Sequence, residues 1–187
     1  RFAVTQEGRV TEYKYDAAGN VIATISYTGT LFPTAGIAAN TSISETSLAN
    51  WVTANADKTQ TQRTDNVYDF RGNITTTTAW SKTDSAGAGV TTEDWSRMNY
   101  VYDQSGRLLS RLVSGTNVLG GEVNAAETFI YDGLGRVISI GDVYGQTTTI
   151  TINDGTRVTT VTTPNDVTRT STFNNGGELL SVAESGA

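Results

Sequence analysis

Four aspartates, each three residues before a glycine, are the residues whose type and spacing could do chemistry. Paired carboxylates can serve as acid and base in glycoside hydrolysis, and carboxylates at alternate positions can bind calcium. No stretch of the chain matches a calcium loop with a central glycine. All four also occupy the same place in a repeated motif, which favours one shared structural role over catalysis. They are Asp16, Asp69, Asp103 and Asp132.

The composition excludes several classes of protein. The chain has 187 residues with no Cys and no His, which rules out cysteine-ligated zinc, disulfides, cysteine nucleophiles and histidine-based triads. Its formal net charge is -6, which argues against binding to a nucleic-acid backbone. No apolar stretch approaches the length of a membrane span. We therefore expect a chain that is not an enzyme, with no cofactor, no metal, no nucleic-acid partner and no membrane span.

The repeated motif is an aromatic residue, Asp, two variable residues, Gly, a polar residue and an aliphatic residue. The aromatic residues of the four full copies are Tyr15, Tyr68, Tyr102 and Tyr131, and their glycines are Gly19, Gly72, Gly106 and Gly135. Two degenerate copies, which match the motif only in part, flank these. One starts at Val4 and the other is formed by Phe173, Asn174 and Gly177. Self-similarity of this kind indicates an array whose units pack against their neighbours.

Each copy reads as the end of one strand, a turn and the start of the next strand. The Asp side chain can accept from N–H groups within the turn, and the Gly can adopt positive φ. A lone hairpin is marginal in water, so the hairpins must pair sideways. We predict an all-β fold, an array of antiparallel hairpins in a curved open sheet. One face should be aromatic and the other rich in Thr, as in the strands predicted over residues 74–80, 147–152 and 157–163.

Some intervals depart from this pattern. We predict that residues 1–187 form one segment of a larger protein, in which residues 28–66 are an insertion with a short helix at about residues 44–58. Ser44 is the expected N-cap, because apolar residues follow it at helical spacing. Residues 84–90 and 114–121 are rich in Gly and Ser and predict loops.

Aromatic residues offer a second kind of chemistry, because their faces can stack on sugar rings. The motif tyrosines lie regularly on one strand face, which favours packing on the next hairpin. The three tryptophans lie outside the motif and are better candidates for glycan contact if they are exposed, although burial is the commoner use of Trp. They are Trp51, Trp80 and Trp95.

The four copies resemble the YD repeats of bacterial RHS proteins, which recur in insecticidal toxin complexes and in teneurins. Gly106-Arg107-Leu108 and Gly135-Arg136-Val137 fit that pattern best, and the resemblance runs from about Val4 to Leu179. In this family the repeats wind into a hollow β-sheet shell, which in toxin members encloses a C-terminal effector. The paired Asp-Pro motifs of the family's self-cleaving region have no counterpart in the chain.

The resemblance implies a non-enzymatic shell or scaffold segment of a large bacterial protein that is secreted or on the cell surface. Its partners would be the remaining repeats of the same chain and an enclosed C-terminal effector. The alternative is a surface adhesion module that binds glycans through exposed aromatic residues.

Overall fold

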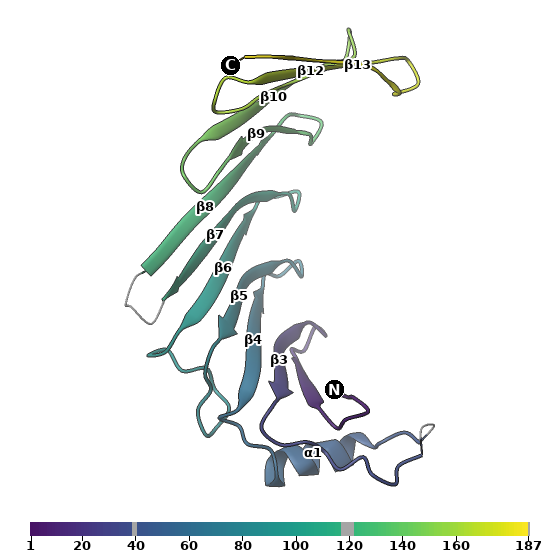
Figure 1. The fold of residues 1–187 in the computed structure, drawn as a ribbon, viewed down its shortest axis with the longest axis vertical. Coiled ribbons are helices and arrows are strands. Elements are labelled where there is room, and N and C mark those ends of the chain that lie inside the picture. The colour runs from purple at the N-terminus through teal and green to yellow at the C-terminus, as the bar shows by residue number, and fades with distance from the viewer. Residues whose placement is uncertain (39–40, 117–121, 187) are drawn as a thin grey trace. The chain divides into compact units, whose positions relative to one another are not determined.

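In a computed structural model, residues 1–38, 41–116 and 122–186 are described. They form one antiparallel sheet whose thirteen strands keep the order of the sequence (Figure 1). The strands are β1 (Phe2–Val4), β2 (Val10–Tyr15), β3 (Val21–Tyr27), β4 (Thr61–Tyr68), β5 (Ile74–Trp80), β6 (Trp95–Tyr102), β7 (Leu108–Thr116), β8 (Glu122–Tyr131), β9 (Val137–Gly141), β10 (Thr147–Asn153), β11 (Val158–Thr162), β12 (Thr168–Phe173) and β13 (Leu179–Ser185). The predicted all-β array of antiparallel hairpins is confirmed.

The chain divides into two compact units. The N-terminal unit comprises Arg1–Asn99 and Val113–Val123, and the C-terminal unit comprises Tyr100–Leu112 and Asn124–Ala187. The motif turns that begin at Asp16 and Asp69 belong to the N-terminal unit, and those that begin at Asp103 and Asp132 belong to the C-terminal unit.

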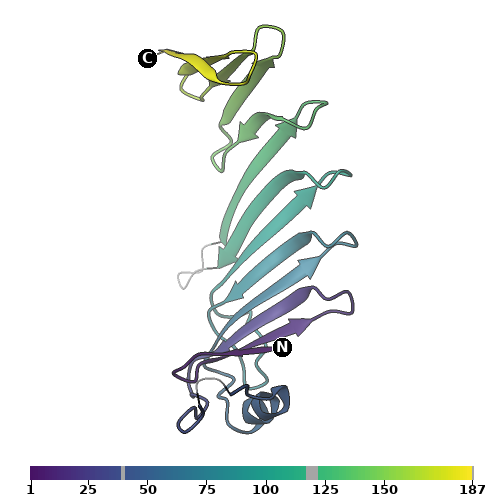
Figure 2. The same cartoon turned by 90° about the vertical axis from the view of Figure 1, so that its right-hand side faces the viewer.

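A short helix, α1 (Glu45–Ala54), lies beside the first strands of the N-terminal unit (Figure 2). The Ser44 side chain accepts a hydrogen bond from the Ser47 N–H at 3.1 Å, which satisfies one free donor of the first turn. The helix ends at Ala54, earlier than the predicted end near residue 58. Asp57 explains the early end, because its side chain accepts from the Thr59 N–H and starts a turn.

The hydrophobic core lies between α1 and the sheet of the N-terminal unit. The Trp51 ring meets the rings of Tyr27 and Phe32 edge-on, with centroids 6.2 and 5.9 Å away. Glu12 is the charged residue of this region, and it is 4% exposed. Its carboxylate accepts from the Tyr27 hydroxyl at 2.9 Å and from the Arg1 guanidinium at 3.0 Å, so its burial is compensated. The buried members of the core are Val10, Ile25, Tyr27, Leu48, Trp51 and Val52.

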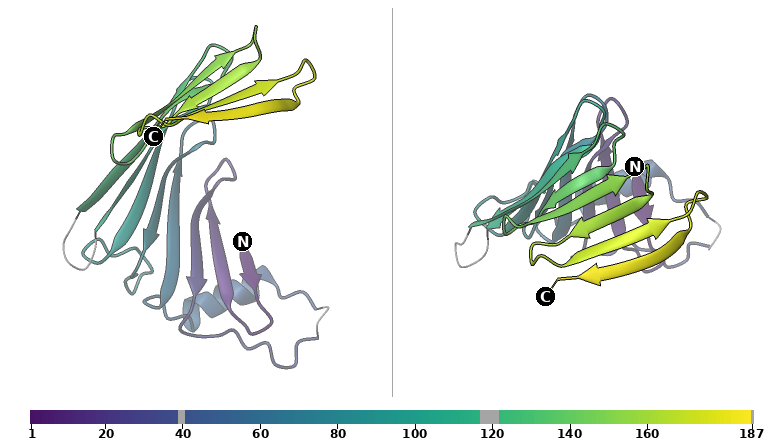
Figure 3. Two further views of the ribbon diagram at one scale, coloured as in Figure 1. Left: turned by 45° about the horizontal axis from the view of Figure 1, so that its top comes forward. Right: turned by 90° about the horizontal axis from the view of Figure 1, so that it is seen from above.

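The C-terminal unit is built differently, as strands side by side (Figure 3). None of residues 100–112 and 125–186 is buried. One face of its sheet carries apolar pairs, Phe129 opposite Ile140 and Ile150 opposite Val161, and Arg169 follows Val161 on the next strand. The other face carries Thr in rows across three strands. These rows are Thr149, Thr162 and Thr168, and next to them Thr151, Thr160 and Thr170.

One loop prediction is wrong. Residues 114–121 were expected to form a loop, but β7 continues to Thr116. Gly115 suits that strand because a Cβ there would lie 2.7 Å from the Trp95 carbonyl oxygen of the neighbouring strand. The rest of this predicted loop, residues 117–121, lies outside the described residues. The loop predicted at residues 84–90 folds into a turn, flanked by an isolated bridge between Thr83 and Gly89.

Candidate functional site

The four full motif copies, here called the aspartate turns, share one backbone geometry. In each, the Gly N–H donates to the Asp carbonyl oxygen at 3.0–3.1 Å. The Asp N–H donates to the carbonyl oxygen of the residue after the Gly at 2.9–3.0 Å. The glycine φ values lie between 81° and 88°, a region that is strained for residues with a Cβ. The glycines are Gly19, Gly72, Gly106 and Gly135.

Each motif aspartate caps its own turn. One carboxylate oxygen accepts from the N–H groups two and four residues further on, at 2.8–2.9 Å in all four copies. The other oxygen accepts from the side chain four residues further on, for example from Asn20 onto Asp16 at 2.9 Å and from Arg136 onto Asp132 at 2.7 Å. The carboxylate therefore replaces the backbone partners that the turn residues lack.

These hydrogen bonds stabilise the ionised form of the aspartates. The side-chain amide of Asn73 and neighbouring N–H groups lower the pKa of Asp69 from 3.8 to about 2. For Asp103 and Asp132, the hydrogen bond from the backbone N–H four residues further on is the main cause of the lowered pKa. A general acid needs a raised pKa, so this environment suits capping rather than proton donation. Within the described ranges, no three His, Cys, Asp or Glu side chains are grouped to hold a metal ion.

The same turn also occurs where the sequence analysis did not expect it. Asp142 and Gly145 form one between β9 and β10, and Asp84 and Gly87 form another in the loop after β5. Neither Asp follows an aromatic residue, which is why the full motif did not include them. A search for Asp-x-x-Gly alone finds both. The degenerate copy at Phe173 has this geometry too, with Asn174 as the capping residue and Gly177 at a φ of 83°.

Two motif tyrosines tie their hairpin to the hairpin before it. The Tyr68 hydroxyl donates to the Val21 carbonyl oxygen at 3.0 Å, and the Tyr131 hydroxyl donates to the Leu108 carbonyl oxygen at 2.8 Å. In both cases the acceptor is the aliphatic residue that ends the preceding motif copy. Tyr15 is 50% exposed. The Tyr102 ring stacks on that of Tyr100 with centroids 6.4 Å apart.

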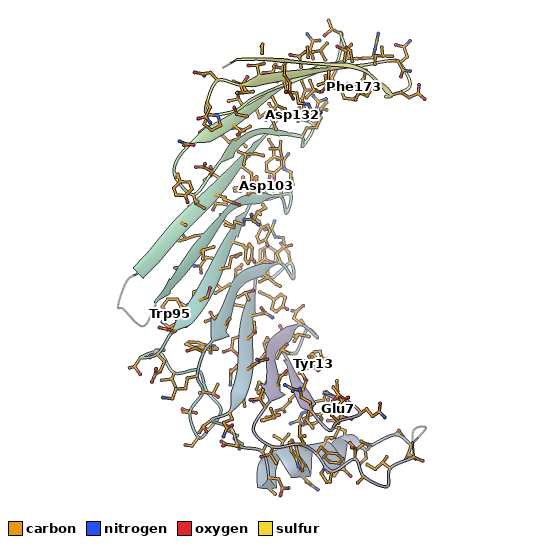
Figure 4. All side chains as sticks on the ribbon, viewed as in Figure 1. Glu7, Tyr13, Trp95, Asp103, Asp132 and Phe173 are labelled. Carbon is orange, nitrogen blue, oxygen red and sulfur yellow. The ribbon has the colours of Figure 1, made fainter. Side chains whose placement is uncertain are left out.

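The sixth motif residue reaches the following turn in the C-terminal unit. Figure 4 shows Asp103 and Asp132 in neighbouring turns at the same end of the strands. Arg107 pairs with Asp103 at 2.6 Å, and its guanidinium lies 4.9 Å from the centre of the Tyr131 ring. Arg136 donates two hydrogen bonds to Asp154 at 2.6 and 3.0 Å, and these raise the pKa of the Arg136 guanidinium. The aspartate turns at Asp103 and Asp132 are thus linked to each other, and the Asp132 turn is linked to the turn that contains Asp154.

The three tryptophans all lie in the N-terminal unit, in different settings. Trp51 is 7% exposed and belongs to the core, so its ring is not available to a sugar. Trp80 and Trp95 are half-buried and directly opposite each other on β5 and β6. The Trp80 Nε1–H donates to Asp65 at 2.7 Å. Only the pair Trp80 and Trp95 therefore remains a candidate glycan contact among them.

Comparison with known proteins shows the fold. The chain is similar to the crystal structure of TcdB2-TccC3 without its hypervariable C-terminal region and to that of TcdB2-TccC3, with TM-scores of 0.59 and 0.58. Both matches have 18% sequence identity and cover 95% of this chain. The chain spans 8% of the length of those chains. No family model and no curated protein matches the sequence. The shared fold is thus that of a part of the TcdB2-TccC3 chains.

Proposed function

We propose that the chain is a non-enzymatic structural segment of an RHS-type shell, which encloses or scaffolds an effector in a large secreted bacterial toxin. The observation that carries this proposal is the uninterrupted strand order from β1 to β13, with neighbouring turns tied by motif side chains. The fold shared with part of TcdB2-TccC3 supports it. The partners are then the other repeats of the same protein and the enclosed effector.

The mechanism would be confinement. A sheet in which every strand pairs with the next leaves no opening along its length for solvent or proteases. The Thr rows of β10 to β12 would make a neutral polar surface, which hydrates well and offers few charges to hold a cargo. The motif carboxylates are engaged in their own turns, and this supports a role without catalysis.

Cryo-electron microscopy of the full-length protein tests this proposal. We expect β1 and β13 to pair with further strands in a continuous wall around enclosed density. Limited proteolysis should then cut the enclosed part only after the wall is opened by denaturant. A map in which this segment stands alone, with both edge strands in solvent, contradicts the shell.

The second candidate is a surface adhesion module that binds glycans. The half-buried pair of Trp80 and Trp95 favours it, because Trp51 is closed off in the core. A glycan array on the purified protein separates the two functions. Glycan binding that is lost when Trp80 or Trp95 is changed to Ala supports adhesion. An array on which no glycan binds leaves the shell as the supported function.

A further inference from the structure

We propose that Lys14 and Lys58 bind one short aliphatic carboxylate in a cavity between β2, β3, α1 and the loop after β5. The cavity has a volume of about 140 Å³, which is room for roughly four water molecules. That volume suits a carboxylate with about one or two further carbon atoms. The site goes beyond the shell proposal, because the cavity lies outside the repeated motif. Its walls include Glu12, Lys14, Ile25, Val52, Lys58 and Gly87.

One face of the sheet supplies the floor of the cavity. Glu12 and Lys14 lie two residues apart on β2, so their side chains point to the same face. Ile25 is the register partner of Glu12 on β3, and Tyr27 lies two residues further along that strand. This is the face that α1 covers, because the Tyr27 and Trp51 rings meet there. The four sheet residues therefore face the same space beneath the helix.

The loop after β5 lines one side of the cavity and is fixed by hydrogen bonds. The Thr83 hydroxyl donates to the Lys58 carbonyl oxygen at 2.7 Å. The Arg63 guanidinium donates to the Gly87 carbonyl oxygen. The Gly87 N–H in turn donates to the Asp84 carbonyl oxygen at 2.8 Å. The wall and the backbone of Lys58 are thus held in place, and binding would cost little entropy for ordering them.

The chain has three lysines, and two of them line this cavity. The third, Lys82, pairs with Glu93 at 2.8 Å. Lys58 is half-buried and Lys14 is exposed. Within residues 1–38, 41–116 and 122–186, neither of these two ammonium groups has a hydrogen-bond or ion-pair partner. A carboxylate between them would accept charge-assisted hydrogen bonds from both.

The carboxylates near the cavity already have partners. One Glu12 oxygen accepts from the Arg1 guanidinium at 3.0 Å, and the other accepts from the Tyr27 hydroxyl at 2.9 Å. Asp57 and Asp84 each accept from the backbone N–H two residues further on. The lysine ammonium groups therefore set the charge that a ligand meets. They attract an anion and repel a cation.

The cavity suits a carboxylate better than a phosphate. Phosphate sites use helix N-termini, Arg side chains or free backbone N–H groups. Here α1 contributes Val52 from its last turn, where the helix dipole is negative and opposes a doubly charged anion more than a singly charged one. Ile25 and Val52 are 3% and 8% exposed, and they offer apolar contact to a short carbon chain. The ligand is therefore assigned as a short carboxylate, either a free acid or the side chain of a Glu in a peptide.

Methyl NMR spectroscopy of the purified protein tests this site, because the Ile25 and Val52 methyl groups line the cavity. We expect saturable shifts of both signals when sodium acetate or propionate is added at constant ionic strength. Lys14→Gln and Lys58→Gln should each weaken propionate binding about tenfold, since each removes a charge-assisted hydrogen bond. Lys82→Gln is the matched control with the same change of charge. It should leave binding unchanged, because Lys82 has its own ion pair.

Two further ligands define the chemistry and its source. Propionamide has the shape of propionate without the charge and should not bind. A glutamate with both ends capped presents the same carboxylate on a peptide. Tighter binding of the capped glutamate than of propionate identifies a peptide side chain as the ligand, and weaker binding identifies a free acid. Backbone NMR spectra check that each variant is folded, and Lys14→Gln serves alone if Lys58→Gln is not.

Three results would overturn the proposal. The first is the absence of a saturable methyl shift with acetate, propionate and capped glutamate. The second is propionamide or inorganic phosphate that binds at least as tightly as every carboxylate. The third is propionate binding that Lys82→Gln weakens as much as Lys14→Gln does, which would indicate a general effect of charge. None of these results bears on whether the strand edges pair in a shell.

Discussion

The N-terminal and C-terminal units use the same turn but stabilise their strands differently. In the N-terminal unit, α1 covers part of the sheet and closes a core around Trp51. In the C-terminal unit, no residue of 100–112 and 125–186 is buried, yet the strands keep a regular register. The repeated motif therefore does not need a hydrophobic core beside it. Backbone pairing and the ties between neighbouring turns maintain the array where a second layer is lacking.

This contrast has an energetic consequence. A half-exposed apolar residue removes less area from water than a buried one, so the C-terminal unit gains less from each side chain. Its hairpins must share stability with their neighbours, because a single hairpin is marginal. Changes in the core should therefore act strongly and locally, and changes in the turns should spread along the array.

The largest effect is expected for Trp51→Ala. Removing a buried indole should cost the N-terminal unit about 3–5 kcal/mol through lost transfer energy and a cavity. Hydrogen exchange measured by mass spectrometry should show faster exchange in β1 to β3, while β9 to β12 stay protected. Ile150→Ala in the C-terminal unit is the comparison, and it should cost less because Ile150 is half-exposed. If both substitutions lowered the free energy of unfolding equally, the N-terminal unit would not depend on its buried core more than the C-terminal unit depends on its half-buried side chains.

A smaller effect is expected for glycine replacements in the turns. Gly135→Val should cost about 1–3 kcal/mol, because its φ of 82° strains a branched residue. Gly106→Val should cost less, since a Cβ at Gly106 meets nothing within 4 Å whereas one at Gly135 meets the Arg107 guanidinium at 3.3 Å. Gly133→Val is the control within the same turn, where a Cβ enters open space. Thermal melts that do not separate Gly133→Val from Gly135→Val would contradict the turn geometry.

The tyrosine ties predict a still smaller loss. Tyr131→Phe removes the hydrogen bond to Leu108 and should cost about 1 kcal/mol in urea unfolding. Tyr68→Phe removes the equivalent bond to Val21 in the N-terminal unit. Tyr144→Phe should be neutral, because Tyr144 is exposed. If the C-terminal unit relies on its ties, Tyr131→Phe should speed exchange in more strands than Tyr68→Phe.

The smallest expected effect is a dependence on acid pH. The pKa of Asp69 is about 2 in the folded chain, below its ordinary value of 3.8. Its contribution is therefore fully present above pH 3.8 and is lost as the pH falls toward about 2. Asp69→Asn should remove this part of the dependence. All three tryptophans lie in the N-terminal unit, so Trp fluorescence reports that unit, and far-ultraviolet circular dichroism reports both.

Acid should affect the two units unequally. The pKa values of Asp103 and Asp132 are lowered as well, and residues 100–112 and 125–186 include no buried side chain that could offset the loss of their turns. Circular dichroism should therefore change at a higher pH than Trp fluorescence. Coincident changes would show that the core does not protect the N-terminal unit.

Much of the fold could be predicted because the motif combines three local signals. The aromatic residue, the Asp and the Gly each have a physical role within a few residues, and the same holds for the N-cap Ser44. The turn at Asp142 lacked the aromatic signal. Gly115 was assigned to a loop because a glycine in a strand is explained only by the neighbouring backbone, here Trp95.

The site residues were harder to predict than the fold. The buried Glu12 depends on Tyr27 and Arg1, which are distant in the sequence. The pairing of Trp80 with Trp95 depends on the length of the loop between β5 and β6, and its register has no signal in the sequence.

The ties between turns have a direction. Arg107 and Arg136 reach forward to the hairpin made after them, and Tyr68 and Tyr131 reach back to the hairpin made before them. Each new hairpin that leaves the ribosome can therefore dock on a finished one, where its Tyr finds an acceptor already in place and the waiting Arg of the earlier turn gains its partner. Growth by addition at one end would spare the nascent chain a long search for contacts distant in the sequence.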